Sequence, residues 1–279
     1  MMKKIAITAT LLLCLLTACG ATDAADLSGP GGGNAVQDRP PGQESAQNPE
    51  AVPETGTAES APAPEASQNY YMNKNYIIKP KSDDVDGKIA LLTFDDGPKD
   101  AEVLQSILDT LDKYEAKAIF FINGYRAEVK PELVKLMHSR GHSIGNHSWD
   151  HIDLKKEEDA EAIRQITEVQ RLVKEITGEA PGFFRPPFGS GGDVVKQAAK
   201  EAGMLYMTWS NGSRDWMDGY DITDKIIESV LEQLHPGSNI LMHELPWTAD
   251  ALDPLLSALQ DKGYRFVHPK EIDPDVSEM

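Results

Sequence analysis

The sequence predicts an α/β fold in which helices cover a parallel β-sheet. From Lys88 onward, short apolar runs alternate with longer segments that have the 3.6-residue period of helices. Strands and helices that alternate in this way form parallel sheets. The polar clusters nearly all follow the apolar runs, which is the end of the strands where parallel α/β folds place their functional sites.

The apolar runs are the expected strands. The first, residues 89–94, is short and apolar, and it stops at the turn signal Asp95-Asp96-Gly97-Pro98. The later runs lie at residues 118–122, 142–146, 183–184, 205–209, 238–242 and 264–267. About seven strands of this kind either close into a barrel or remain an open doubly wound sheet, and periodicity alone does not separate the two.

The expected helices fill the segments between these runs. They lie at residues 101–114, 130–141, 157–177, 193–203, 222–234 and 249–262. In the longest, residues 157–177, we expect Ile163, Ile166, Val173 and Ile176 to face inward. Gly178 is its expected C-terminal stop.

The N-terminal segment has the pattern of a secretory signal. Two lysines precede an apolar run that is too short to span a membrane as a stable helix, and small residues follow it. The ending Leu16-Thr17-Ala18-Cys19 resembles a bacterial lipobox, in which the cysteine is lipidated and becomes the first residue. We therefore expect a lipoprotein signal peptide at residues 1–18, with an ordinary signal cleaved near Ala18 as the alternative.

Residues 19–70 are expected to form a disordered tether behind the lipidated Cys19. This segment is rich in Gly, Pro, Ala, Ser, Gln and Glu and has almost no branched apolar residues, so it cannot bury enough surface to offset the entropy of ordering it. The folded domain is then expected at residues 71–279, with its core at about 88–267.

Cysteine content and charge restrict the partners. The only cysteines are Cys14 and Cys19, and Cys14 lies in the segment expected to be removed, so the mature domain has no thiol pair. The formal net charge of −18 argues against nucleic acid and against an anionic membrane surface as partners. We expect an extracytoplasmic protein that is anchored to the bacterial cell membrane by a lipid on Cys19, and no protein partner is evident.

Asp95 and Asp96 are the first candidate functional residues. Adjacent carboxylates after a strand often only form a tight turn, in which Gly97 takes a positive φ. However, neighbouring strand residues point in opposite directions. At the end of a strand, one Asp can therefore bind a metal ion while the other faces the substrate.

His147 and His151 supply a second cluster. Two His at i and i+4 fall on one helical face and can share a metal ion, although a lone pair of this kind is more often two solvated side chains. Two neutral imidazoles and one carboxylate leave positions open for water, which is the arrangement of catalytic rather than structural metal sites.

Three further clusters are weaker on their own. The first is the segment Arg185-Pro186-Pro187-Phe188-Gly189, which is either only a rigid loop or a binding site for an oxyanion. Because proline has no N–H, the Phe188 N–H is the first free backbone donor after Arg185. Asp215-Trp216 is equally well a loop turn with a partly buried indole. His243 follows an apolar strand that contains Leu241, a place where a lone His is more often structural than catalytic.

Together, the order and spacing of the five clusters resemble the polysaccharide deacetylase family, which is carbohydrate esterase family 4 with its NodB homology domain. The resemblance covers roughly residues 89–267, and the motifs TFDDGP and HSWDH match without a gap. It implies a distorted (β/α) barrel.

The resemblance also implies a role for each residue. One divalent ion, expected to be Zn²⁺ with Co²⁺, Ni²⁺ or Mn²⁺ as alternatives, would be held by Asp96, His147 and His151. Asp95 would be the general base and would pair with Arg185. His243 would be the proton donor, and Asp215 would orient it. The Phe188 N–H would stabilise the oxyanion, and Leu241 and Trp216 would line the pocket for the acetyl group.

Two departures from the family pattern stand out. The family often has another Asp a few residues before the Asp-Trp pair, where this chain reads Ser210-Asn211-Gly212-Ser213-Arg214. Phe188 stands where many members have Tyr, but its implied role uses only the backbone.

The expected function is metal-dependent hydrolysis of N-acetyl groups on a cell-envelope polysaccharide. N-acetylglucosamine or N-acetylmuramic acid of peptidoglycan is the expected substrate, and chitin-like, exopolysaccharide or xylan substrates are alternatives. A catalytically inert, glycan-binding lipoprotein on the same fold is the alternative from a different class of protein.

Overall fold

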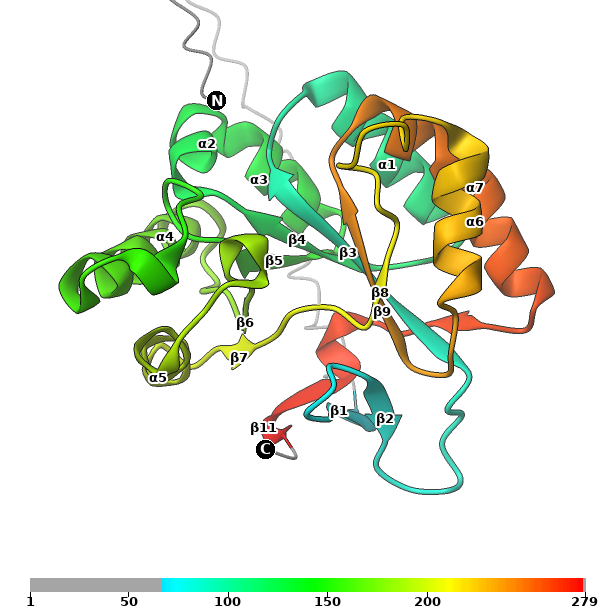
Figure 1. Cartoon of the computed structure of the whole chain (residues 1–279), viewed down its shortest axis with the longest axis horizontal. Coiled ribbons are helices and arrows are strands. Elements are labelled where there is room, and N and C mark those ends of the chain that lie inside the picture. The colour runs from blue at the N-terminus through cyan, green and yellow to red at the C-terminus, as the bar shows by residue number, and fades with distance from the viewer. Residues whose placement is uncertain (1–66, 278–279) are drawn as a thin grey trace, which may run out of the picture. The chain divides into compact units, whose positions relative to one another are not determined.

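The computed structural model of this chain describes residues 67–277 (Figure 1). The expected signal peptide, the lipid attachment at Cys19 and nearly all of the expected tether lie outside the described residues. Within residues 67–277, no helix is both long enough and apolar enough to cross a lipid bilayer.

The main sheet is parallel throughout. Its order is β7-β6-β5-β4-β3-β9-β8, and β10 pairs with the start of β3. The strands are β3 (Ile89–Gly97), β4 (Ala118–Ile122), β5 (Ser143–Asn146), β6 (Phe183–Phe184), β7 (Leu205–Tyr206), β8 (Asn211–Gly212), β9 (Ser238–His243) and β10 (Arg265–Phe266). The sheet curls so that β7 and β8 stand at its two ends, which confirms the expected distorted (β/α) barrel.

The helices connect these strands and cover the outside of the sheet. They are α1 (Ala101–Lys113), α2 (Gly124–Val129), α3 (Pro131–Ser139), α4 (Asp159–Thr177), α5 (Asp193–Glu201), α6 (Thr223–Glu232) and α7 (Pro246–Asp261). In Figure 1, α1, α6 and α7 lie together on one side, and α2 to α5 lie on the other. Each expected helix is present, and α2 is an additional one.

A second sheet of three short strands was not predicted. β1 (Tyr70–Met72) pairs with β2 (Ile78–Pro80) and, in parallel, with β11 (Ile272–Ser277). Tyr70 is 1% exposed and begins β1, so it belongs to the packed domain and not to the tether expected at residues 19–70. Ile272, at 2% exposed, extends the packed domain beyond the other end of the expected core at 88–267. β1 and β2 have three residues each, which is too short for a period of two to be recognised in the sequence.

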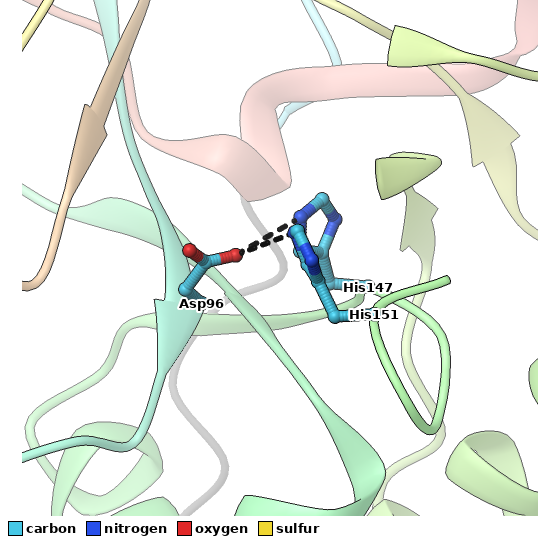
Figure 2. Close-up of side chains that lie close together, drawn as sticks. All are labelled: Asp96, His147 and His151. Atoms are coloured by element: carbon cyan, nitrogen blue, oxygen red, sulfur yellow. Dashed lines mark ion pairs between the residues drawn. The ribbon is translucent and has the colours of Figure 1, made fainter. Parts of the chain in front are cut away.

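The carboxyl ends of the parallel strands carry the predicted polar clusters. β3 ends in Asp95, Asp96 and Gly97, and β9 ends in His243. The chain after β5 brings His147 and His151 opposite Asp96 (Figure 2). The candidate residues therefore lie at one edge of the sheet, the edge where parallel α/β folds have their functional sites.

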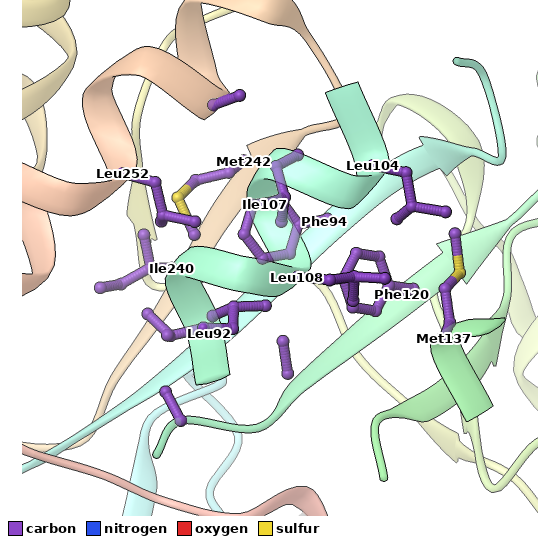
Figure 3. Packing of buried hydrophobic residues seen from close by; sticks show 14 of the residues in the cluster. Leu92, Phe94, Leu104, Ile107, Leu108, Phe120, Met137, Ile240, Met242 and Leu252 are labelled. Atoms are coloured by element: carbon purple, nitrogen blue, oxygen red, sulfur yellow. The ribbon is translucent and has the colours of Figure 1, made fainter. Parts of the chain in front are cut away.

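The core explains why β3 is apolar over nearly its whole length. Its alternate residues Leu92 and Phe94 pack against the helices on the outer face (Figure 3), and Ala90 belongs to the same cluster. Ile89 and Leu91 point to the opposite face, where they join a separate cluster inside the curl. A strand that is buried on both faces reads as a continuous apolar run rather than an alternating one.

The longest helix is predicted correctly except at its start and at one inward-facing position. Ile166 and Val173 are buried, and Ile176 is partly buried against the core. Ile163 is 41% exposed, so the expectation that it faces inward is wrong. The helix begins two residues later than expected, at Asp159, and Ile163 stands in its first turns, where Ala162 fills the inner position instead.

Candidate functional site

A bulge at the end of β3 re-aims Asp96. Asp95 pairs with Phe121 and Gly97 pairs with Ile122, which leaves Asp96 as the extra residue between them, with a φ of 67°. The expected opposite orientation of the two carboxylates is therefore wrong. Asp95 Oδ2 and Asp96 Oδ1 lie 3.7 and 3.4 Å from the same atom, Nε2 of His147. A bulge changes the direction of a side chain in this way.

The same bulge corrects the expectation for Gly97. The left-handed conformation belongs to Asp96, and Gly97 is not among the glycines with positive φ. A Cβ on Gly97 would lie 2.6 Å from Oε2 of Glu244. Glycine is needed here because another side chain approaches closely, and not because of the turn.

His147 and His151 lie in a loop, so the expectation of a shared helical face is wrong. β5 ends at Asn146, and both Ser148 and His151 have a positive φ, at 64° and 55°. The side chain of Asn146 accepts the Ser148 N–H at 3.0 Å and stabilises the loop. The spacing of four residues therefore brings the two imidazoles together through a turn, with their ring centroids 5.2 Å apart.

Asp96, His147 and His151 form a group that fits a metal ion. Their candidate ligand atoms all lie within 4.8 Å of one another. Oδ1 of Asp96 is buried without a hydrogen-bond partner, yet it lies 3.0 Å from Nε2 of His151 and 3.4 Å from Nε2 of His147 (Figure 2). One carboxylate and two imidazole nitrogens that converge on one point are a typical ligand set for a catalytic divalent ion.

The electrostatics of Asp96 agree with this reading. Burial alone would raise the pKa of the Asp96 carboxyl, but the interactions with His147 and His151 and the charge of Lys99 hold it well below its usual range. The Nδ1 atom of His147 lies 2.7 Å from the carbonyl oxygen of Arg185, which accepts its proton and leaves Nε2 free to face Asp96.

Asp95 is paired with a fully buried arginine. Arg185 is 0% exposed, and its Nη1 donates to Oδ1 of Asp95 at 2.7 Å and to Oγ1 of Thr93 at 2.8 Å. Nη2 donates to the carbonyl of Thr208 and to the side chain of Asn239. Burial lowers the pKa of the Arg185 guanidinium, and Asp95 offsets part of this shift. The expected pairing of Arg185 with Asp95 is present.

The pair of His243 and Asp215 is also formed as expected. Nδ1 of His243 lies 2.7 Å from Oδ1 of Asp215. Burial alone would lower the pKa of His243, but the hydrogen bond and charge of Asp215, with smaller contributions from Asp95 and Asp96, raise it above its ordinary value. Across the sheet, Asp95 is the direct partner of His243 in the pairing of β3 with β9.

Two of the three predicted substrate-contacting residues lie against these groups, and the third stands in β9, the strand that ends in His243. Phe188 has a φ of 59° in the short helix Pro187–Gly189, and its 66% exposed ring packs edge-on against His151 at 4.8 Å between centroids. The ring of Trp216, 47% exposed, lies 5.1 Å from that of His243. Leu241 is buried in β9, and its carbonyl accepts the N–H of Ser213 in the loop that leads to Asp215.

Several residues of the site were not predicted. Thr93 and Asn239 both contact Arg185, Thr248 contacts Asp215, and Glu244 contacts the turn after Asp96. Thr93 stands two residues before Asp95, and such residues lie on the same face of a strand. The sequence could therefore have indicated that Thr93 lies beside Asp95. Asn239 is a buried polar residue inside an apolar strand, and buried polar groups of this kind need partners.

Comparison with known proteins gives a family match. The model of the family described as polysaccharide deacetylase matches residues 82–207. The chain is 37% identical over 200 residues to the peptidoglycan-N-acetylmuramic acid deacetylase PdaC of Bacillus subtilis (strain 168). This match covers 71% of the chain and 42% of PdaC, so the chain spans less than half the length of that relative.

A shorter relative is covered almost completely. A peptidoglycan-N-acetylglucosamine deacetylase of Bacillus cereus (strain ATCC 14579) is 35% identical over 191 residues, which are 66% of this chain and 88% of that protein. The solved structure of PdaC from Bacillus subtilis superposes with a TM-score of 0.60 at 35% identity and covers 66% of this chain and 89% of the solved one.

A structure with a different description is similar too. BA3943 from Bacillus anthracis, described as a CE4 family pseudoenzyme, has a TM-score of 0.64 at 28% identity and covers 69% of this chain and 67% of the solved one. The extent of the match to the Bacillus cereus relative and the agreement of the fold show that this chain belongs to the polysaccharide deacetylase family.

Proposed function

We propose that this protein hydrolyses N-acetyl groups on a cell-envelope polysaccharide and releases acetate. The observation that carries the proposal is the arrangement at the edge of the sheet. The ligand group of Asp96, His147 and His151 has the Asp95–Arg185 pair on one side, and the adjacent strand β9 ends in His243, which is held by Asp215. These are the groups that a metal-dependent amide hydrolysis needs.

A metal ion on these ligands would supply Lewis acidity, and the chain itself supplies the proton transfers. Asp96, His147 and His151 would hold a divalent ion, which would polarise the acetyl carbonyl and lower the pKa of water near it. Asp95 is the base that accepts a proton from the attacking water, and Arg185 holds its carboxylate in place. His243, whose pKa is raised by its contact with Asp215, donates a proton in its charged form to the leaving amine nitrogen.

The remaining groups bind the acetyl group. The Phe188 N–H is proposed to donate to the oxygen on which negative charge develops, because the two preceding prolines and the turn hold this backbone rigidly. Leu241 and Trp216 are proposed to line the small pocket for the methyl group. The exposed ring of Trp216 beside His243 supports this role, because it offers an apolar surface next to the proton donor.

Peptidoglycan is the proposed substrate, with N-acetylglucosamine or N-acetylmuramic acid as the sugar. Relatives that are described as acting on each of these sugars are similar to this chain at 35–37% identity. Chitin-like oligomers, other exopolysaccharides and acetylated xylan are the alternative substrates.

An inert glycan-binding protein is the second candidate, and the similarity to the pseudoenzyme BA3943 favours it. The side chains argue for the enzyme. Asp95, Asp96, His147, His151 and His243 are all present, and they are brought together at one edge of the sheet. Acetate release that a chelator abolishes would separate the two candidates.

We also propose Zn²⁺ as the ion and an extracytoplasmic, lipid-anchored location. A set of two imidazoles and one carboxylate suits Zn²⁺, although it accepts Co²⁺, Ni²⁺ and Mn²⁺ as well. The lipobox-like ending at Cys19 and the composition of residues 19–70 support the anchor and the tether.

The test is acetate release from purified peptidoglycan and from defined acetylated oligosaccharides. The metal-free protein should be inactive, and adding back Zn²⁺, Co²⁺, Ni²⁺ or Mn²⁺ should show which ion restores activity. Mass spectrometry of wall fragments from cells with and without the protein locates the sugar. Identical acetylation in both would contradict the proposed substrate, and no acetate from any glycan would favour the inert protein.

A further inference from the structure

Glu244 is a buried carboxylate beside His243 that the proposed chemistry does not use. It is 2% exposed, and its Oε2 atom is buried without a hydrogen-bond partner. Burial raises the pKa of this carboxyl, although two backbone N–H groups counteract the shift. Burying a carboxylate lowers stability unless hydrogen bonds replace those lost to water. The groups that Glu244 contacts therefore indicate its structural role.

The contacts of Glu244 are with the turn that contains Asp96. Oε1 of Glu244 accepts the backbone N–H of Lys99 at 2.7 Å and that of Asp100 at 3.1 Å. The backbone N–H of Glu244 lies 3.5 Å from the carbonyl oxygen of Asp95. Glu244 therefore contacts the chain both before and after the three residues Asp96 to Pro98.

The turn is shaped to let this side chain in. A Cβ on Gly97 would meet Oε2 of Glu244 at 2.6 Å, and the next atom in its path would be Cε of Met137 at 3.6 Å. Gly97 does not have a positive φ, so its backbone does not require glycine. Glycine at this position is thus explained by the approach of Glu244.

Lysine side chains complete the contacts of the turn. The ammonium group of Lys130 donates to the carbonyl oxygen of Lys99. The ammonium group of Lys99 in turn lies 3.4 Å from Oδ2 of Asp96. This contact engages Oδ2 and leaves Oδ1 as the atom that faces the two imidazoles.

We propose that Glu244 is a positioning residue that clamps the turn after β3 and so holds the Asp96 ligand oxygen in place for the metal ion. The inference rests on the proposed metal site, and it adds a link from β9 to that site. The end of β9, which carries His243, is thereby also proposed to hold Asp96 of β3 in place. Groups behind the ligands of a metal ion commonly affect its affinity by 10- to 100-fold.

Metal affinity of the full-length chain is the direct test. The dissociation constant for Zn²⁺ is measured by competition with a chromophoric chelator, and the unfolding midpoint of each metal-free variant is measured alongside. Glu244→Ala should bind Zn²⁺ roughly 10- to 100-fold more weakly than wild type. Glu244→Gln keeps an acceptor for the two N–H groups and should recover most of the affinity.

A matched control removes a similar contact far from the site. Glu271 accepts the backbone N–H of His268 at 2.9 Å and pairs with Arg265, near the start of β3. Glu271→Ala should lower the unfolding midpoint and leave Zn²⁺ affinity unchanged. This control separates a general loss of stability from a loss of ligand positioning.

Gly97→Ala tests the clamp without removing Glu244, and it decides the matter if Glu244→Ala does not fold. Its methyl group would push against Oε2 and should weaken Zn²⁺ binding. Wild-type affinity in both Glu244→Ala and Gly97→Ala would overturn the clamp alone. Absence of Zn²⁺ binding by the wild-type chain would instead overturn the metal site itself, and the clamp with it.

Discussion

Asp215 holds His243 through two separate atoms. Oδ1 of Asp215 lies 2.7 Å from Nδ1 of the imidazole, and Oδ2 accepts the backbone N–H of His243 at 2.7 Å. Oγ1 of Thr248 donates to the same Oδ2 at 2.6 Å. Because the carboxylate accepts the Nδ1 proton, the ring is fixed in the orientation that turns Nε2 away from Asp215.

Asp215→Asn should therefore move the alkaline limb of the pH profile to lower pH. His243 acts as an acid only while it is protonated, and activity falls as pH rises through its pKa. Asp215 raises this pKa, so its loss lowers the pKa and removes the acid form at lower pH. The measurement is kcat/KM for acetate release across the pH range.

Turnover near neutral pH should also fall, by about 100-fold or more, which is the scale of losing a general acid. Asp218→Asn is the matched control, because Asp218 is an exposed carboxylate three residues further along the same loop. An unchanged alkaline limb in Asp215→Asn would mean that His243 is not the group that titrates there.

Asp95→Asn should keep the metal ion and lose most of the activity. Asp95 lies beside the ligand group, but its Oδ1 is engaged by Arg185, and the ligand group is complete without it. We expect turnover to fall by about 100-fold or more because a general base is lost. Elemental analysis should find one ion per chain in Asp95→Asn and little in Asp96→Asn; normal turnover would reassign the base.

His147→Ala should lose metal affinity, whereas His142→Ala should not. The two imidazoles are equally buried, each at 2% exposure, so the comparison holds burial constant. Nε2 of His147 faces Asp96, whereas Nδ1 of His142 accepts the backbone N–H of Ala118 away from the ligand group. Zn²⁺ content after dialysis is the measurement, and equal content in the two variants would remove His147 from the ligand set.

The sequence predicted the strands and helices around the site because their signals are local. Residues 118–122 were predicted as a strand with the bounds that the structure has, and α4 ends before Gly178 as expected. β8 was missed because it consists of Asn211 and Gly212, a pair that reads as a turn rather than a strand. The sheet of β1, β2 and β11 was missed because its pairing joins the two ends of the domain. No local pattern carries information on such distant pairing.

The membership of the metal group could be predicted, but its geometry could not. The order and spacing of the motifs placed Asp96, His147 and His151 together. The bulge at Asp96 and the loop conformation of His151 depend on contacts across the sheet and with Asn146. Glu244 was missed for the same reason, since its two N–H partners lie far from it in the sequence, at Lys99 and Asp100.

The buried pair of Arg185 and Asp95 should be among the larger single contributions to stability near the site. Removing one partner of a buried ion pair leaves the other charge without compensation, which costs about 3–5 kcal/mol. Arg185→Met should therefore lower the free energy of unfolding by this amount, as measured by urea denaturation of the metal-free chain. The cost is expected to be high because Arg185 is 0% exposed and also donates to the carbonyl of Thr208.

Arg164 offers the matched control, because it forms ion pairs with Glu161 and Glu168 on the surface of α4 with its side chain 41% exposed. Water screens such pairs, so Arg164→Met should cost at most about 1 kcal/mol. Combining Arg185→Met with Asp95→Asn should cost less than the sum of the two single changes, because the orphaned charge is then removed. Equal costs for Arg185→Met and Arg164→Met, or strict additivity in the double variant, would show that the buried pair does not act as a coupled unit.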